Sequence, residues 1–166
     1  MRLLRALAII ALLVVAVFAG YRFFSRSREV TNKSVTVYYT KTDGSTLASW
    51  NVSLGPARDL ASIAFYATVQ ALAGPPPDTA AIRFPSGTIT RAVHVKGATA
   101  TVDLGGAIAT EQSGSLAEDG EFKALVWTLT ALPGVSAVQV RIDGARVTTL
   151  PGGHLELDES LTRQSW

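Results

Sequence analysis

The sequence predicts an α+β domain, a two-layer sandwich in which two helices pack on one face of a mixed or antiparallel sheet. Apolar residues recur at helical spacing in residues 60–72 and again in residues 122–132. Pairs of segments with alternating apolar and polar residues flank both regions and are typical of hairpins. The resulting order, β-β-α-β-β-α-β-β, favours helices gathered on one side of a sheet.

The N-terminal segment, residues 1–24, is predicted to be a signal anchor that crosses the membrane. Every residue from 6 to 20 is apolar or glycine, behind a basic start. As a helix, residues 3–24 span about 33 Å, which is enough for a bilayer core of roughly 30 Å. The segment also resembles a secretory signal peptide, with Ala19 before the cleavage point. We therefore expect a single-pass protein of the cell membrane with an extracytoplasmic domain, or alternatively a secreted protein.

Positive charge is concentrated near this segment. Residues 1–29 carry a net charge of +4 and residues 30–166 carry −2, which gives +2 for the whole chain. The slightly acidic globular part lacks the basic face with which nucleic-acid-binding domains contact phosphates, so we expect no nucleic-acid partner. Residues 25–34 are polar and predict a linker.

The first predicted unit is a hairpin followed by a helix. Residues 35–39 and 47–54 alternate like strands, and Asp43-Gly44 suits the turn between them. Asp59 is expected to cap the helix N-terminus and Gly74 to end the helix.

A second hairpin is expected between the helices. With a loop at residues 97–98, Val93 faces Val102 in the core, and His94 lies on the solvent face diagonal to Asp103. The first strand is expected to present four alternate residues to the core: Ile89, Arg91, Val93 and Val95.

The second helix is expected to start with a capping box, Ser115 to Glu118. Three acidic residues lie in its first turns, where the helix dipole favours them: Glu118, Asp119 and Glu121. After the Pro133-Gly134 break, a third hairpin is expected around Asp143-Gly144. That hairpin makes Arg141 and Arg146 face each other outside the core, which is unfavourable unless the pair is solvated or binds an acidic partner. Residues 158–166 are read as a polar tail.

Residues 35–157 resemble the GerMN domain family, a bacterial envelope module of sporulation and spore-germination proteins. The matching stretches follow the family's order: Val-Tyr-Tyr at 37–39, Ala-Leu-Ala-Gly-Pro at 71–75, Pro-Ser-Gly-Thr at 85–88, Ala-Thr-Val-Asp-Leu at 100–104, Glu121, Thr-Leu-Thr at 128–130, and residues 135–144. The resemblance implies a single GerMN copy with a fold similar to ring-building motifs. It supplies no catalytic residue to transfer.

The sequence gives little support for catalysis. Without cysteine there is no disulfide, thiolate metal site or thiol nucleophile. A hydrolase triad would need a nucleophile near His94 and Asp103, but no nucleophile-elbow pattern occurs. His154 lies near Glu156 and Asp158, yet a polar tail explains these residues without a metal. We therefore expect no enzyme, no metal and no cofactor.

The expected function is that of a membrane-tethered, extracytoplasmic interaction or assembly module of the bacterial cell envelope. Its partner is expected to be another envelope protein or a second copy, reached through sheet edges or the exposed sheet face. Residues 3–24 would contact the cytoplasmic membrane. A domain that binds cell-wall glycan or an anionic wall polymer is the alternative. Four residues are the candidates for the contact: Arg141, Arg146, His94 and Asp103.

Overall fold

The computed structural model describes residues 34–55 and 59–166. The predicted membrane segment, and the predicted linker up to residue 33, lie outside these residues. Within the two described ranges, no helix combines the length and the apolar character that crossing a bilayer requires.

The described chain contains five strands, two α-helices and two short 3-10 helices. In chain order they are β1 (Ser34–Thr40), β2 (Leu47–Ser53), α2 (Leu60–Ala73), β3 (Thr88–Lys96), β4 (Thr99–Gly106), η1 (Ala107–Ala109), α3 (Ser115–Leu129), β5 (Ala137–Ile142) and η2 (Arg163–Ser165). The α+β class is therefore confirmed.

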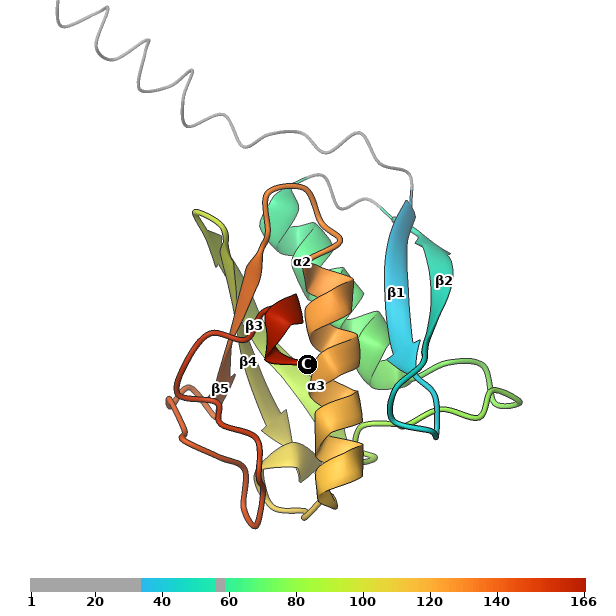
Figure 1. Cartoon of the computed structure of the whole chain (residues 1–166). Coiled ribbons are helices and arrows are strands. Elements are labelled where there is room, and N and C mark those ends of the chain that lie inside the picture. The colour runs from blue at the N-terminus through green and yellow to red at the C-terminus, as the bar shows by residue number, and fades with distance from the viewer. Residues whose placement is uncertain (1–33, 56–58) are drawn as a thin grey trace, which may run out of the picture.

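The helices lie between two small sheets, so the expected α+β arrangement of two helices with a mixed sheet is confirmed, while the strands form two sheets where one was expected. β1 and β2 form an antiparallel pair, and β3, β4 and β5 form a separate sheet. Helix α3 packs against β1, α2 packs against β3, and the two helices contact each other (Figure 1). The physical reason for the second sheet lies in α3, where three consecutive residues, 124–126, are buried and only a narrow stripe that includes Asp119 is exposed. A helix of this kind needs neighbours in several directions.

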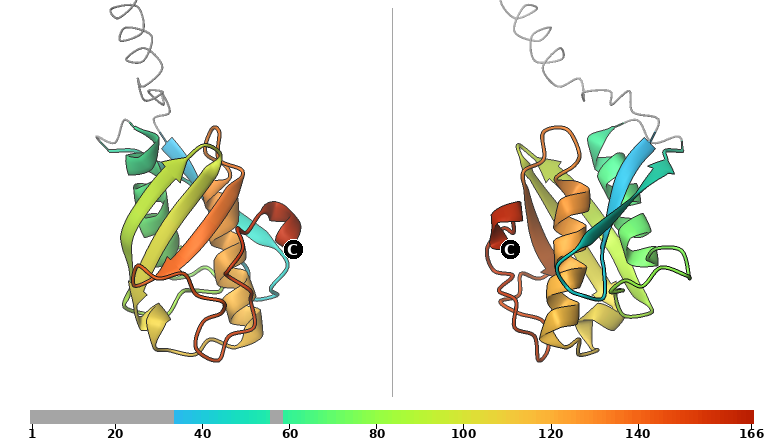
Figure 2. Two further views of the ribbon diagram at one scale, coloured as in Figure 1. Left: turned by 90° about the vertical axis from the view of Figure 1, so that its left-hand side faces the viewer. Right: turned by 45° about the vertical axis from the view of Figure 1, so that its right-hand side comes forward.

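The three-stranded sheet is mixed. β3 pairs with β4 antiparallel, and β4 pairs with β5 parallel, which leaves β3 and β5 at the edges (Figure 2). The predicted hairpin register is confirmed, with Val93 opposite Val102 and His94 opposite Thr101.

A β-bulge at Arg91 changes which residues of β3 reach the core. The register shifts between Thr90 and Ala92, and a bulge of one residue reverses the alternation of side chains beyond it. Ile89 is therefore 51% exposed and Arg91 is exposed, while Thr88 and Thr90 turn inward. The expectation that Ile89 and Arg91 share the core face with Val93 is wrong.

The third hairpin is reduced to its turn. Asp143 and Gly144 have φ values of 50° and 81°, as the turn requires, but Ile142 and Ala145 form only an isolated bridge. The chain then runs back over β5, where Leu161 bridges Val138. The residues read as a polar tail thus pack on the domain, because Leu161 is buried and the Trp166 ring stacks edge-on against Trp127.

The predicted N-terminal cap is confirmed for α2 and is wrong for α3. Asp59 caps α2, and its carboxylate accepts a hydrogen bond from Ser62 N at 2.9 Å. The capping box at Ser115 is wrong, because Gly114 is the N-cap and makes no side-chain cap. Glu118 is turned instead toward the backbone N–H of His154, at 2.7 Å.

Thr128 joins α3 to β1. Its buried hydroxyl donates to Ala124 O at 2.8 Å and accepts from Tyr38 N at 2.9 Å. Replacing Thr128 with valine leaves the Tyr38 N–H without its acceptor, so we expect a loss of about 1–3 kcal/mol of unfolding free energy in urea denaturation. Thr68→Val is the matched control, because the buried Thr68 hydroxyl donates only to Ala64 O of its own helix. Equal losses in both variants would contradict the assigned role.

Candidate functional site

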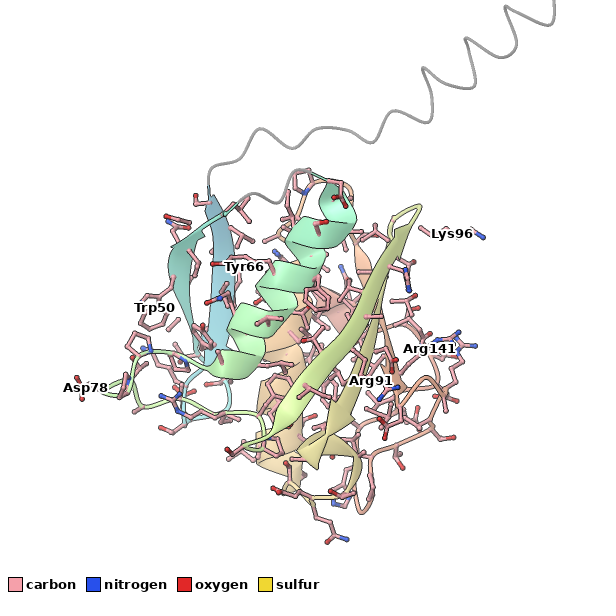
Figure 3. The ribbon with its side chains drawn as sticks, turned by 180° about the vertical axis from the view of Figure 1, so that it is seen from behind. Trp50, Tyr66, Asp78, Arg91, Lys96 and Arg141 are labelled. Atoms are coloured by element: carbon pink, nitrogen blue, oxygen red, sulfur yellow. The ribbon has the colours of Figure 1, made fainter. Side chains whose placement is uncertain are left out.

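The solvent face of the β3-β4-β5 sheet brings the predicted contact residues together. We call it the arginine face and define it by Arg91, His94, Asp103, Arg141, Asp143 and Arg146. Arg91 of β3 and Arg141 of β5 project on the same side of the molecule in Figure 3. Asp103 of the central strand is opposite Arg141 in the parallel pairing.

Asp103 organises this face. One carboxylate oxygen accepts the Gly144 N–H at 2.7 Å, and the other lies 3.3 Å from Arg91 Nε. Arg91 also reaches Asp143, with Nη1 at 3.3 Å from the carboxylate. These contacts hold the Asp143-Gly144 turn after β5 against β3 and β4. Exposed ion pairs add at most about 1 kcal/mol each, so their main effect is to fix the position of the turn.

Gly105 makes this arrangement sterically feasible. A Cβ at Gly105 would lie 2.6 Å from the Asp143 carboxylate and 2.9 Å from Arg91 Cδ. A side chain there would displace the Arg91 and Asp143 side chains, so this glycine favours the ion pair through the space it leaves rather than through its backbone angles.

Arg141 and Arg146 do not form the opposed pair that a full hairpin would give. Arg141 Nη1 donates to Gly144 O at 3.2 Å, and Arg146 Nη2 donates to Gln139 Oε1 at 2.6 Å. Both side chains are exposed. The ion pairs within the described residues all involve Arg91, so Arg141 has no carboxylate partner there. Its charge is available to a ligand.

His94 lies on the same face but not in a catalytic arrangement. Its side chain is exposed, and both oxygens of the Asp103 carboxylate are already engaged by Gly144 and Arg91. Across residues 34–55 and 59–166, no three histidine or acidic side chains come together as a metal-binding group. His154 contributes only its backbone N–H, to Glu118.

Two buried carboxylates were not anticipated from the sequence. Glu118 and Glu121 are 1% and 2% exposed, although the helix dipole alone would leave them in solvent. Burial raises the pKa of Glu121 to about 7, opposed by a hydrogen bond from Ser113 Oγ and reinforced by the nearby charge of Glu118. A signal was present in the sequence, because Glu118 and Glu121 are three residues apart and share a helix face with Leu125.

A groove of about 620 Å³ lies between α2 and β3. We call it the α2–β3 groove; it is lined by Val69, Leu72 and Ala73 of α2, residues 83–87 of the preceding loop, and Thr88, Ile89 and Thr90 of β3. No residue from β4 or β5 lines it. This groove was not predicted from the sequence, because it depends on Ile89, which the alternating pattern of β3 assigned to the core and which is exposed.

The domain belongs to the α+β class. Two helices lie between a two-stranded and a three-stranded sheet, and the solvent face of the three-stranded sheet is cationic. Residues 36–148 match the family model Germane, described as sporulation and spore germination, and the chain belongs to this family. The predicted GerMN type is thereby confirmed.

Solved structures share this fold. The first GerMN domain of the sporulation protein GerM from Bacillus subtilis is 20% identical, with a TM-score of 0.62 over 80% of this chain and 99% of that one. A putative lipoprotein from Clostridium perfringens is 17% identical, with a TM-score of 0.58 over 82% and 94%. The tandem GerMN domains of GerM from Bacillus subtilis are 21% identical, with a TM-score of 0.63 over 80% of this chain and 46% of theirs. A comparison with curated proteins found no match.

Proposed function

We propose that this chain is a membrane-tethered, extracytoplasmic interaction module of the bacterial cell envelope that carries one GerMN domain and catalyses no reaction. Residues 3–24 hold it in the cytoplasmic membrane, and the domain binds another envelope protein or a second copy of itself. Membership in a sporulation and spore-germination family supports an envelope role.

The observation that supports the proposal most strongly is that Arg141 is exposed and lacks a carboxylate partner among the described residues. Its guanidinium is held by a backbone carbonyl. The neighbouring Arg91 is neutralised by two aspartates, whereas Arg141 and Arg146 bond only to neutral oxygens among the described residues. Such an arrangement supports recognition of an acidic surface, where charge complementarity selects the partner and speeds association.

Charge reversal at Arg141 tests the arginine face. Arg141→Glu in the full-length chain is expected to lower proximity cross-linking to its envelope neighbour about fivefold or more in cells, which corresponds to about 1 kcal/mol. Lys41→Glu is the matched control, because Lys41 is also exposed but lies next to β1, on the other sheet. Arg146 is left unchanged, since it bonds Gln139 and supports the packing of the chain end.

The outcomes separate the partner classes. Equal cross-linking in Arg141→Glu and Lys41→Glu would exclude the arginine face as the contact. A chain that stays monomeric at high concentration and cross-links to no envelope protein would contradict the interaction function itself. Retention of the chain on purified wall material, lost in Arg141→Glu, would identify a wall polymer as the ligand in place of a protein.

A further inference from the structure

The α2–β3 groove runs along the free edge of β3. Thr88, Ile89 and Thr90 are consecutive, and their side chains alternate between the two faces of the sheet, yet all three line the groove. β3 is an edge strand, paired only with β4 among the described strands. Figure 3 looks onto α2 and β3 side by side. The groove is therefore bounded by a helix on one side and by an unpaired strand edge on the other.

Exposed apolar side chains gather at this place. The large exposed hydrophobic residues of the described chain are Phe65, Val69, Ile89 and Leu116, at 39%, 37%, 51% and 57% exposure. Val69 of α2 and Ile89 of β3 both line the groove, and Phe65 lies one helical turn before Val69. Leu116 alone lies elsewhere, on α3. A concentration of this kind marks a binding surface more often than scattered apolar residues do.

The groove has one charged lining residue, Arg83, and no lining carboxylate. Arg83 is exposed, and its Nη2 donates to Pro76 O at 3.1 Å. A guanidinium has five N–H donors in a planar fork, so most of them remain for a ligand. An anionic group is the complementary partner.

We propose that the α2–β3 groove binds a short, extended, acidic segment of a partner protein, which adds to the edge of β3. The segment places an aliphatic side chain between Val69 and Ile89 and an aspartate or glutamate on Arg83. Backbone hydrogen bonds to an edge strand provide affinity in this mode, and the side-chain pockets provide specificity. The inference rests on the proposed interaction function but uses a surface different from the arginine face.

The bulge in β3 favours a short segment over a second copy of the domain. Pairing between two copies of β3 would need a long, regular edge, whereas the bulge and the exposed Arg91 interrupt this edge directly after Thr90. Bulges and edge charges are the features that limit extended strand pairing between domains. The usable edge is then short, from the Thr88 carbonyl to Thr90, because the Thr88 N–H already donates to Pro85 O at 3.0 Å.

The test is selection of a displayed library of short random peptides on the full-length chain. Enriched peptides are expected to carry Val, Ile or Leu close to Asp or Glu. A fluorescein-labelled copy of the most enriched peptide, measured by fluorescence anisotropy, is expected to bind Val69→Asp and Arg83→Glu about tenfold or more weakly. Leu116→Asp is the matched control and is expected to bind like the unmodified chain, since Leu116 lies outside the groove.

A peptide of reversed charge distinguishes the loss of the Arg83 contact from misfolding of the variant. A peptide with its acidic residue replaced by lysine is expected to recover binding to Arg83→Glu, which a misfolded variant would not show. Enriched peptides that bind Val69→Asp and the unmodified chain equally would overturn the proposal. So would octanoate that binds with the same dependence on Val69 and Arg83 while no peptide is enriched, because the groove would then be a site for small anionic amphiphiles.

The two proposals fail separately. Peptide binding that depends on the groove, together with unchanged cross-linking of Arg141→Glu, would retain the groove and reject the arginine face. Cross-linking that depends on Arg141, with no groove-dependent peptide, would retain the proposed function and reject the groove.

Discussion

Replacing Phe122 with alanine is expected to remove about 3–5 kcal/mol of unfolding free energy, a large share of the total for a domain of this size. The Phe122 side chain is completely buried. Its ring meets Phe84 edge-on, with centroids 5.9 Å apart and an interplanar angle of 78°. Truncation removes this aromatic contact and leaves a cavity that a core between two sheets cannot close easily. Urea denaturation of the full-length chain, followed by circular dichroism, measures the loss.

Phe122→Leu is the control, because leucine keeps most of the buried volume. We expect it to cost clearly less than the alanine variant, about 1–2 kcal/mol. Phe84 lines the α2–β3 groove, so Phe122→Ala is also expected to weaken peptide binding there. A loss below about 1 kcal/mol in Phe122→Ala would mean that the two rings do not form a continuous part of the core.

Local features of this fold could be predicted because a few residues decide each of them. Gly97 takes a positive φ of 61°, which permits the tight turn and thereby sets the register between Val93 and Val102. Asp59 caps α2 because a short carboxylate before a helix reaches the free N–H groups of the first turn. Neither feature depends on distant parts of the chain.

The layer arrangement could not be predicted, because it depends on contacts between distant segments. Alternation in β1 identifies a strand with one apolar face but does not say which element covers that face. The covering element is α3, which is joined to β1 by hydrogen bonds between Tyr38 and Thr128 and between Thr40 and Gly120. These residues are far apart in the sequence. The order of elements along the chain is the same whether the strands form one sheet or two.

The candidate site was predicted in part for the same reason. Pairing rules placed Arg141 and Asp103 on the solvent face of the sheet, but the partners of these residues come from elsewhere. Arg91 reaches Asp103 through a bulge that the alternating pattern of β3 conceals. Arg146 bonds Gln139 because the chain leaves the turn without forming a second strand. Bulges and incomplete hairpins depend on packing that no local pattern reports.

Glu121 is expected to make the domain less stable as the pH rises from about 4.5 to about 7. Burial raises the pKa of this carboxyl from 4.5 to about 7 in the folded chain. In this range the folded state keeps a proton that the unfolded state has lost, so each increase in pH favours unfolding. The difference between the two pKa values corresponds to about 3 kcal/mol, fully lost above pH 7. Glu121 Oε2 has no hydrogen-bond partner among the described protein atoms, so little there stabilises the charged form.

Glu121→Gln is expected to remove this pH dependence and to raise stability at pH 8 by up to about 3 kcal/mol, because the amide resembles the protonated acid and stays neutral. Its carbonyl oxygen keeps an acceptor for Ser113 Oγ, which lies 3.1 Å from the glutamate. Asp119→Asn is the matched control, since it removes the same charge from an exposed position of the same helix. Urea denaturation at several pH values measures both variants. If Glu121→Gln kept the slope of the unmodified chain, the buried Glu121 carboxyl would not be the group that titrates.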